Sequence, residues 1–344
     1  MTDAGTKTSR LQPIKRWLRS WIPSRLWAIT ATTWHLAKTT PLLCAQVLKG
    51  GWPHLILHFG SSPGDDLLCT VVARELKQRG ARSLWMASYH PTLFAENPDI
   101  ACVFTPGPWL DLIRKRAPEI VPSLGYSNHD PVADIGTSPD RHILEIMSAA
   151  AGVHGTIKLR PRMHLSKEEL RQQEWASGCL AIQSSGLQAL SPMLNKQWQA
   201  GRFQEICTTF AATCPIVQLG LPGDPPLAGA IDMRGRTSLR ETAAILSHAR
   251  LYIGTVGLLM HLARAVDCRS VIIYGGRERP EQTGYTCNIN LATDVPCSPC
   301  WRYNACDHQR MCMDAIDVSA VASAINECLR QPHGALVVDT IHVN

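Results

Sequence analysis

The sequence has few features of an exported or membrane-spanning protein. No apolar segment follows closely behind its start and no small-residue cleavage site stands out, so we expect no secretory signal peptide. The moderately apolar stretch 26–48 contains Lys38 and Pro41 and several threonines, so we do not expect it to span a bilayer. With 344 residues, 45% hydrophobic and 18% charged, the chain is long enough for two soluble α/β domains.

Acidic residues are almost absent from the first 50 residues, which contain eight Lys or Arg and only Asp3. Because the whole chain carries a net charge of +6, the remainder is close to neutral. A basic arm on a nearly neutral body argues against a nucleic-acid-binding groove and favours binding to a surface.

The arm at residues 1–50 has an amphipathic pattern. Helical spacing places apolar residues on one face and basic residues on the other: Ile14, Trp17, Leu18, Trp21 and Ile22 against Lys15, Arg16 and Arg19. Tryptophan beside basic residues is typical of a helix lying on anionic lipid. We therefore expect a cytoplasmic protein, peripheral at the inner face of the inner membrane. The alternative is a helix that packs on the protein's own surface.

Beyond the arm, apolar strands alternate with helices in two successive blocks. The first block has strands at 54–59, 83–87 and 101–105 and helices at 65–79 and 139–151. The second has strands at 179–183, 215–219 and 251–253 and helices at 200–213, 238–247 and 317–330. This rhythm predicts an α/β fold with two Rossmann-like domains facing a cleft, at residues 51–176 and 177–330, and a tail at 331–344.

The stretch 251–274 reads as strand, glycine turn, helix and strand. Gly254 and Gly257 precede a helix whose N-terminal amides and dipole favour an anion such as phosphate. An ordinary crossover without a ligand has the same pattern.

Two polar residues follow predicted buried strands. Asp65 comes after the turn-rich loop 60–64, at the carboxyl edge of a parallel sheet, where α/β proteins bind ligands. An ionised carboxylate there could act as a general base, although the spacing alone favours a helix N-cap. Lys196 lies in a polar loop and could neutralise a diphosphate, although a solvated surface lysine is the commoner case.

Four of the 13 cysteines are clustered, with the spacing C-x2-C-x5-C-x5-C: Cys297, Cys300, Cys306 and Cys312. The first pair has the spacing of a metal knuckle, and four thiolates suit tetrahedral zinc or iron. A closed four-thiolate site has no open position, so we predict a structural metal and no catalytic one. Free thiols or disulfides are the alternative, although we expect a reducing compartment.

Three motifs in order resemble glycosyltransferase family 9, the heptosyltransferase-like enzymes. The stretch Gly64–Thr70 is similar to the signature GD-x-LL-x-T, and Lys196-x-Trp198 looks like the K-x-W motif. Residues 254–263 stand where the family has G-x-D-[ST]-G-x-x-H-x-A, with Gly254, His261 and Ala263 matching. The resemblance covers about residues 52–330.

The resemblance implies a GT-B fold, with the acceptor in the N-terminal domain and a nucleotide-sugar in the C-terminal one. It implies an inverting, metal-independent transfer to a lipid-linked or polysaccharide acceptor of the lipopolysaccharide type. Asp65 would then be the base. The donor would be held by Lys196, by the backbone of Gly257, Leu258 and Leu259, by His261 beside them, and by Asp224 at the ribose.

One departure keeps other functions open. Val256 and Gly257 stand where the family has an acid followed by Ser or Thr, and valine cannot contact the hydroxyls of a donor sugar. Another GT-B enzyme, such as a nucleotide-sugar epimerase, is one alternative. A non-catalytic nucleotide- and metal-binding assembly factor for polysaccharide synthesis is another.

Overall fold

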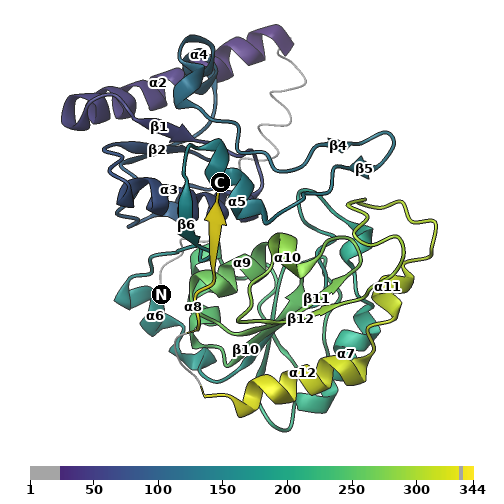
Figure 1. The fold of residues 1–344 in the computed structure, drawn as a ribbon. Helices are drawn as coiled ribbons and strands as arrows, with labels where there is room; N and C mark the ends of the chain where they lie inside the picture. The colour runs from purple at the N-terminus through teal and green to yellow at the C-terminus, as the bar shows by residue number, and fades with distance from the viewer. Residues whose placement is uncertain (1–23, 333–335) are drawn as a thin grey trace.

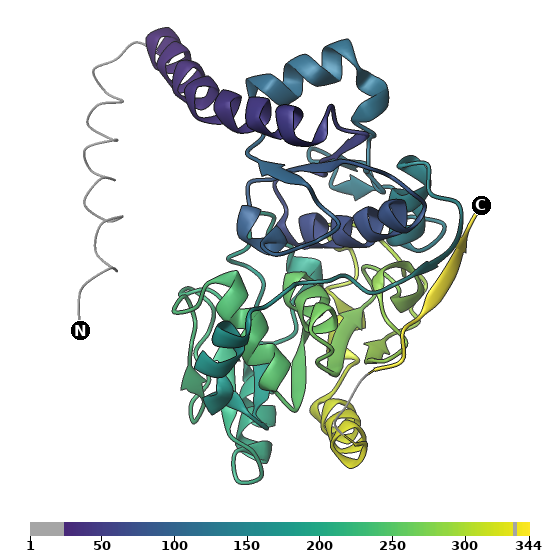
Figure 2. The same ribbon diagram turned by 90° about the vertical axis from the view of Figure 1, so that its left-hand side faces the viewer.

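The computed structural model describes residues 24–332 and 336–344, so the amphipathic face predicted at residues 14–22 lies outside the described residues. Figure 1 shows two α/β parts, each centred on a parallel sheet, and Figure 2 shows that α3 (Pro63–Gln78) lies between them. This arrangement agrees with the predicted pair of α/β domains.

The first part contains a three-stranded parallel sheet in the order β1-β2-β3, formed by β1 (Leu55–Leu57), β2 (Leu84–Ala87) and β3 (Cys102–Phe104). The helices of this part are α2 (Ser24–Gly50), α3, α4 (Pro108–Arg116) and α5 (Ile143–Ala150), with short 3-10 turns at Pro91–Phe94 and Pro118–Ile120. A two-stranded hairpin of β4 (His129–Asp130) and β5 (Ile135–Gly136) projects beside the second part (Figure 1).

The second part contains a six-stranded parallel sheet in the order β12-β11-β10-β7-β8-β9. Its strands are β7 (Leu180–Gln183), β8 (Ile216–Leu219), β9 (Ile231–Asp232), β10 (Leu251–Thr255), β11 (Ser270–Gly275) and β12 (Ile289–Ala292). The adjacent strands β10 and β11 are buried along their whole length, as their continuous apolar sequences predict for a sheet covered on both faces.

Seven helices of this part surround the sheet among the described residues. They are α6 (Lys167–Gln172), α7 (Ala200–Phe210), α8 (Leu239–His248), α9 (Leu258–Ala265), α10 (Pro280–Thr283), α11 (Met311–Asp314) and α12 (Val318–Arg330). Further 3-10 turns lie at Glu174–Ala176 and Leu194–Lys196. In α8, Ser238 and Glu241 form a reciprocal capping box, which fixes where the helix begins.

The tail predicted at 331–344 contains a strand that belongs to the other part of the molecule. β13 (Thr340–Val343) pairs antiparallel with β6 (Gly155–Lys158), and α5 packs against it. The chain therefore returns across the interface after completing the second sheet.

The described part of the basic arm, α2, packs on the first domain. Leu43 is buried in the core below α4, and His35 Nε2 lies 3.1 Å from the carbonyl oxygen of Thr105. Thr40 accepts a hydrogen bond from the indole of Trp109 at 2.9 Å. Among the described residues, no helix combines the length and the apolar character that crossing a membrane requires.

Candidate functional site

The site lies where the first turns of α3 and α9 meet between the two sheets. Ser62 caps α3, and the helix continues through Pro63, Gly64 and Asp65. A Cβ at Gly64 would lie 3.6 Å from the Cα of Leu258, so the two helix starts approach closely. The small residue at this position therefore brings the first-domain carboxylate next to the edge of the second sheet.

Asp65 is not the helix cap, because its own backbone N–H donates to Ser62 Oγ at 3.4 Å. The interpretation favoured by spacing alone was therefore wrong. The side chain instead accepts a 2.7 Å hydrogen bond at Oδ1 from the hydroxyl of Tyr126. Burial raises the pKa of Asp65, although Ser62, Tyr126 and Lys196 act in the opposite direction. A carboxylate of raised pKa is a stronger base than an exposed one.

The neighbouring carboxylate points into the first domain. Asp66 is fully buried and accepts a hydrogen bond from the hydroxyl of Ser88, at the end of β2. Burial raises the pKa of Asp66 to about 6. Of the two adjacent acids, Asp65 is the one that interacts with groups of the second domain.

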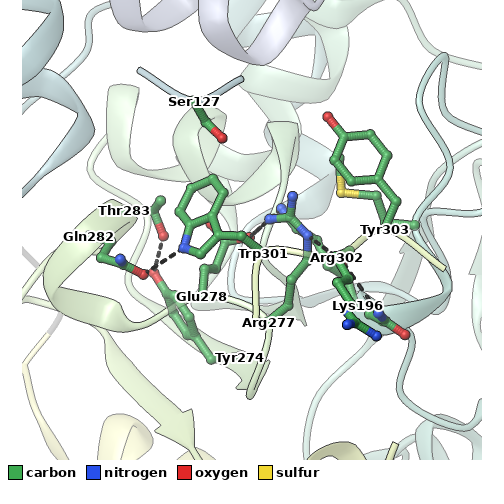
Figure 3. A network of polar contacts seen from close by, with 12 residues as sticks. Ser127, Lys196, Tyr274, Arg277, Glu278, Gln282, Thr283, Trp301, Arg302 and Tyr303 are labelled. Carbon is green, nitrogen blue, oxygen red and sulfur yellow. Dashed lines mark hydrogen bonds and ion pairs between the residues drawn. The ribbon is translucent and has the colours of Figure 1, made fainter. Parts of the chain in front are cut away.

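Lys196 is held in a buried ion pair and is not a solvated surface lysine. Its Nζ lies 2.5 Å from Oε1 of Glu278, and the two side chains are 16% and 3% exposed. The same oxygen lies 3.0 Å from Nη1 of Arg277. Figure 3 shows this network of polar contacts, in which Lys196 and Arg277 converge on Glu278.

The charges of this network influence one another and Asp65. Burial lowers the pKa of Lys196, whereas Glu278 raises it. For Glu278, burial raises the pKa, but Lys196 and Arg277 lower it, so that it settles at about 2. The negative charge of Glu278 in turn raises the pKa of Asp65. Lys196, Glu278 and Asp65 therefore form one electrostatic unit across the domain interface.

Sequence reasoning missed Glu278 and Arg277. A signal was present, because both follow closely behind the buried strand β11, at the carboxyl edge that carries the turn after β10. Val256, at the position of the family acid, is buried among apolar side chains. Val256 carries no carboxylate, and the carboxylate that lies beside Lys196 is that of Glu278.

The other predicted donor-site residues lie along the same sheet edge. His261 in α9 is 7% exposed, its Nδ1 lies 2.7 Å from the hydroxyl of Tyr285, and burial lowers its pKa to about 3, so the imidazole is neutral. Gly257 precedes α9, and Leu258 and Leu259 form its first turn. Their amides are the N-terminal donors expected to face an anion.

Asp224 follows β8, two strands from β10 in the sheet. It is 3% exposed, its Oδ2 accepts a 2.9 Å hydrogen bond from the amide of Leu221, and its Oδ1 has no partner among the described residues. Burial raises its pKa, and Arg234 lowers it. The structure thus brings Asp224 to the same edge without joining it to the Lys196 network, and its contact with a ribose stays a prediction.

The four clustered cysteines line one cavity of about 340 Å³, together with Asn195, Arg277 and His308. All four are partly buried free thiols, and the amide of Arg310 donates to Cys306 Sγ at 3.3 Å. Within residues 24–332 and 336–344, however, no three His, Cys, Asp or Glu side chains are placed closely enough to hold a metal ion. The donor set suits zinc or iron, but the thiols do not converge on one point.

Comparison with known proteins gives a match in the second domain. The model of glycosyltransferase family 9 (heptosyltransferase) matches residues 224–309, which include Asp224, the α9 turn and Glu278. This match confirms the resemblance inferred from the motifs. Among curated protein sequences, none matches this chain.

Three solved structures are similar over most of this chain. The glycosyl transferase family 9 protein from Veillonella parvula has a TM-score of 0.58 at 14% identity, covering 81% of this chain and 97% of its own. TibC, an iron-containing dodecameric glycosyltransferase from enterotoxigenic E. coli, has a TM-score of 0.60 at 20% identity, and the likeness covers 81% of this chain and 76% of TibC. The E. coli ADP-heptose lps heptosyltransferase II has a TM-score of 0.59 at 13% identity, and the likeness covers 80% of this chain and 98% of that one. These likenesses confirm the predicted GT-B fold, and together with the family model they support a glycosyltransferase.

Glu278 is expected to contribute to stability in a pH-dependent way. Its pKa in the folded protein, about 2, lies below its ordinary value of 4.5. The stabilisation is therefore fully present above the unfolded pKa and is lost as the pH falls toward 2. In Glu278→Gln, two buried cations lose their counter-ion, which should cost about 3 kcal/mol at pH 7. Urea unfolding between pH 2.5 and 7 should show a flatter pH dependence for this variant than for the wild type, and parallel curves would contradict the buried pair.

Proposed function

We propose that this chain is an inverting glycosyltransferase that moves a sugar from a nucleotide-sugar to a hydroxyl of a lipid-linked or polysaccharide acceptor. The observation that carries the proposal is the pairing across the interface. Asp65, a partly buried carboxylate of raised pKa on the first domain, faces Lys196 and the first turn of α9 on the second. A base opposite a cation and unpaired helix amides is the arrangement that transfer from a diphosphate requires.

In this mechanism Asp65 takes the proton of the acceptor hydroxyl. The acceptor oxygen forms a bond to the anomeric carbon of the sugar, and the bond from that carbon to the phosphate oxygen breaks. The nucleoside diphosphate leaves with the electron pair, and Lys196 and the amides of Gly257, Leu258 and Leu259 stabilise its charge. Tyr126 keeps the carboxylate of Asp65 oriented through its 2.7 Å hydrogen bond.

Donor binding requires a change of partner at Lys196. In the structure its ammonium group contacts Glu278, and in the complex it would contact phosphate oxygens. Glu278 keeps the 3.0 Å contact with Arg277, so its charge remains compensated after the exchange. The neutral His261 beside α9 adds no competing positive charge.

ADP-heptose is the first donor to test. The similar structure of TibC contains ADP-D-beta-D-heptose, at a TM-score of 0.59 and 16% identity. Val256 keeps the two alternative functions in view, because it offers no hydroxyl contact. An epimerase would act on the donor without an acceptor, and a binding-only assembly factor would bind nucleotide without turnover. Release of ADP only when acceptor is present would exclude both.

Substitution of Asp65 tests the proposed base. Asp65→Asn removes the proton acceptor but keeps the shape of the side chain and its hydrogen bond from Tyr126. Turnover should fall about 10²–10⁴-fold while ADP affinity stays close to that of the wild type. Coupled measurement of ADP release gives turnover, and calorimetry gives affinity. Asp66→Asn would perturb the first-domain core instead, so its defect should appear as lost thermal stability.

Lys196→Ala is the complementary variant. It should weaken ADP binding at least tenfold, because the diphosphate loses its cation, while turnover at saturating donor falls less than in Asp65→Asn. Equal ADP affinity for this variant and the wild type would remove Lys196 from the donor site.

We also propose that the protein lies on the inner face of the inner membrane. Helix α2 and Trp52, two residues after its end, expose large apolar side chains: Trp34 is 63%, Leu48 88% and Trp52 60% exposed. Lys38 lies over the ring of Trp34, with Nζ 3.8 Å from its centroid, and Lys49 follows Leu48. Aromatic and aliphatic side chains next to lysines suit the interface of an anionic bilayer.

Vesicle sedimentation tests this surface. Because α2 packs on the first domain, deletion of residues 1–50 would disturb the core, and substitutions are the sharper tool. The double variant Trp34→Ala/Leu48→Ser should bind phosphatidylserine vesicles several-fold less than the wild type, and added salt should weaken both. Val132→Ser, which changes a 94% exposed residue of the β4–β5 hairpin, is the matched control. Equal binding by all three proteins would locate the contact elsewhere or exclude it.

The clustered cysteines are our proposed metal site. Cys297, Cys300, Cys306 and Cys312 share one cavity, and TibC is described as iron-containing. A bound zinc or iron would draw the four thiolates together and stabilise the segment 297–312. Such a site supplies folding energy and takes no part in the transfer.

Elemental analysis of protein purified anaerobically should find about one zinc or iron per chain. Cys306→Ser should lose the metal and lower the melting temperature of the second domain, because one ligand is removed. Cys214→Ser, at a partly buried cysteine outside the cluster, should keep the metal. Metal-free wild-type protein with four alkylatable thiols would refute the site.

A further inference from the structure

The turn formed by residues 301–305, between Cys300 and Cys306, touches both domains. On one side it contacts the β4–β5 hairpin of the first domain, and on the other it contacts the 3-10 turn Leu194–Lys196. Figure 3 shows Trp301, Arg302 and Tyr303 of this turn beside Arg277 and Lys196. Neither the proposed chemistry nor the proposed metal site uses these contacts.

Asp134 of the hairpin binds the backbone of this turn. Its Oδ1 accepts from the amide of Tyr303 at 2.9 Å, and its Oδ2 accepts from the amides of Asn304 at 2.7 Å and Ala305 at 2.5 Å. His129 contacts the same carboxylate at 2.7 Å and stacks on the ring of Tyr303, with centroids 3.7 Å apart. Three consecutive amides on one carboxylate make a directional, charge-assisted contact between the domains.

The hairpin approaches the 301–305 turn so closely at Gly136 that a residue with a side chain would not fit there. A Cβ at Gly136 would lie 2.4 Å from the carbonyl oxygen of Trp301. Asp134 itself has a φ of 50°, a left-handed conformation that is uncommon outside glycine and asparagine-like residues. The hairpin is therefore shaped to present the Asp134 carboxylate to the turn.

Asn195 binds the opposite side of the same turn. Its side-chain amide donates to the carbonyls of Arg302 at 3.3 Å and Ala305 at 2.9 Å, and its backbone amide donates to the carbonyl of Tyr303 at 3.0 Å. Asn195 immediately precedes Lys196 in the 3-10 turn. These bonds fix the backbone from which the Lys196 side chain extends toward Glu278.

Two peptide units are shared between the two sets of contacts. The peptide that joins Arg302 to Tyr303 donates its N–H to Asp134 and accepts from Asn195 at its carbonyl. The peptide that joins Tyr303 to Asn304 does the same. A carboxylate on the N–H polarises such a unit and strengthens the bond at its carbonyl. The first domain is thus coupled to the backbone beside Lys196 through two peptide planes.

The same turn also holds the partner of Glu278. Arg277 Nε donates to the carbonyl of Arg302 at 3.0 Å, and the guanidinium lies 4.8 Å from the ring centroid of Trp301 and 5.1 Å from that of Tyr303. Both cations that converge on Glu278 therefore depend on the position of the 301–305 turn.

We propose that Asp134 is a positioning residue of the donor site, which acts from the first domain through the 301–305 turn on Asn195 and Lys196. The inference rests on the proposed function, because it takes Lys196 as the ligand of the donor diphosphate. It means that the donor site is complete only while the hairpin is docked, so that separation of the domains weakens nucleotide binding as well as uncovering Asp65.

Calorimetry with ADP tests the coupling. Asp134→Ala should weaken ADP binding about tenfold and raise the KM for the donor with little change in kcat, and Asp134→Asn, which keeps an acceptor oxygen, should fall between it and the wild type. Asp140→Asn, at an 83% exposed carboxylate of the same domain, is the matched control. Asn195→Ala should weaken ADP binding to a similar extent. The double variant Asp134→Ala/Asn195→Ala should lose less affinity than the product of the two single effects, because the side chains of Asp134 and Asn195 bind the same peptide between Arg302 and Tyr303. The inference would be overturned if the loss of ADP affinity in the double variant equalled the product of the two single losses. Unchanged ADP affinity in folded Asp134→Ala would overturn it as well.

Amide hydrogen exchange tests the same contacts without a nucleotide. In Asp134→Ala, the amides of residues 303–305 should lose protection, and residues 193–197 should exchange faster as well. Loss of protection at 303–305 alone would overturn the coupling. Wild-type protein that fails to bind ADP would instead contradict the proposed function, and the exchange result would still decide whether Asp134 positions the Lys196 turn.

Discussion

The site depends on a balance of charge among three largely buried side chains of the second domain, the cations Lys196 and Arg277 and the carboxylate Glu278. Glu278 is 3% exposed and contacts both Lys196 and Arg277 through one oxygen, so removing Glu278 leaves two largely buried cations without a counter-ion. In the proposed exchange of Glu278 for a phosphate, the ammonium group of Lys196 would have to remain charged and in place throughout. The 301–305 turn helps to keep both cations in place, because it binds Asn195, which precedes Lys196, and the side chain of Arg277.

The same constraint gives Asp65 its properties. The carboxylate is partly buried where α3 and α9 begin, and the charge of Glu278 opposes its ionisation further. In the proposed reaction, an acceptor bound beside Asp65 would therefore meet a carboxylate whose surroundings favour its protonated form. Because the opposing groups belong to different domains, the strength of this base depends on how the two domains are docked.

Much of this architecture could be predicted from the chain. Continuous apolar runs identified β7, β8, β10 and β11, and the strand–glycine–helix pattern after β10 located α9. Asp65 was singled out because it follows a buried strand, although its hydrogen bonds to Ser62 and Tyr126 could not be foreseen. Tyr126 is remote in sequence from Asp65, and no local pattern joins them.

The rest depends on contacts between distant segments. Glu278 could have been suspected from its position after β11, but its pairing with Lys196 requires a fold that brings two loops together. The β4–β5 hairpin has strands of two residues each, too short for any periodicity, and the three amides that bind Asp134 become visible only in the folded chain. For the cysteines, the spacing predicted a shared metal ion; the four line one cavity, but among the described residues their side chains are not placed closely enough to hold a metal ion.

The pairing of β13 with β6 has a consequence for how the protein forms. β6 belongs to the first domain, yet its partner strand follows the entire second sheet in the chain. During synthesis from the ribosome, the backbone edge of β6 stays open until residues 340–343 have emerged, and an open edge invites pairing with other chains. Closing so long a loop also slows the last step of folding. The first domain thus reaches its final form only after the second, in the reverse of their order in the gene.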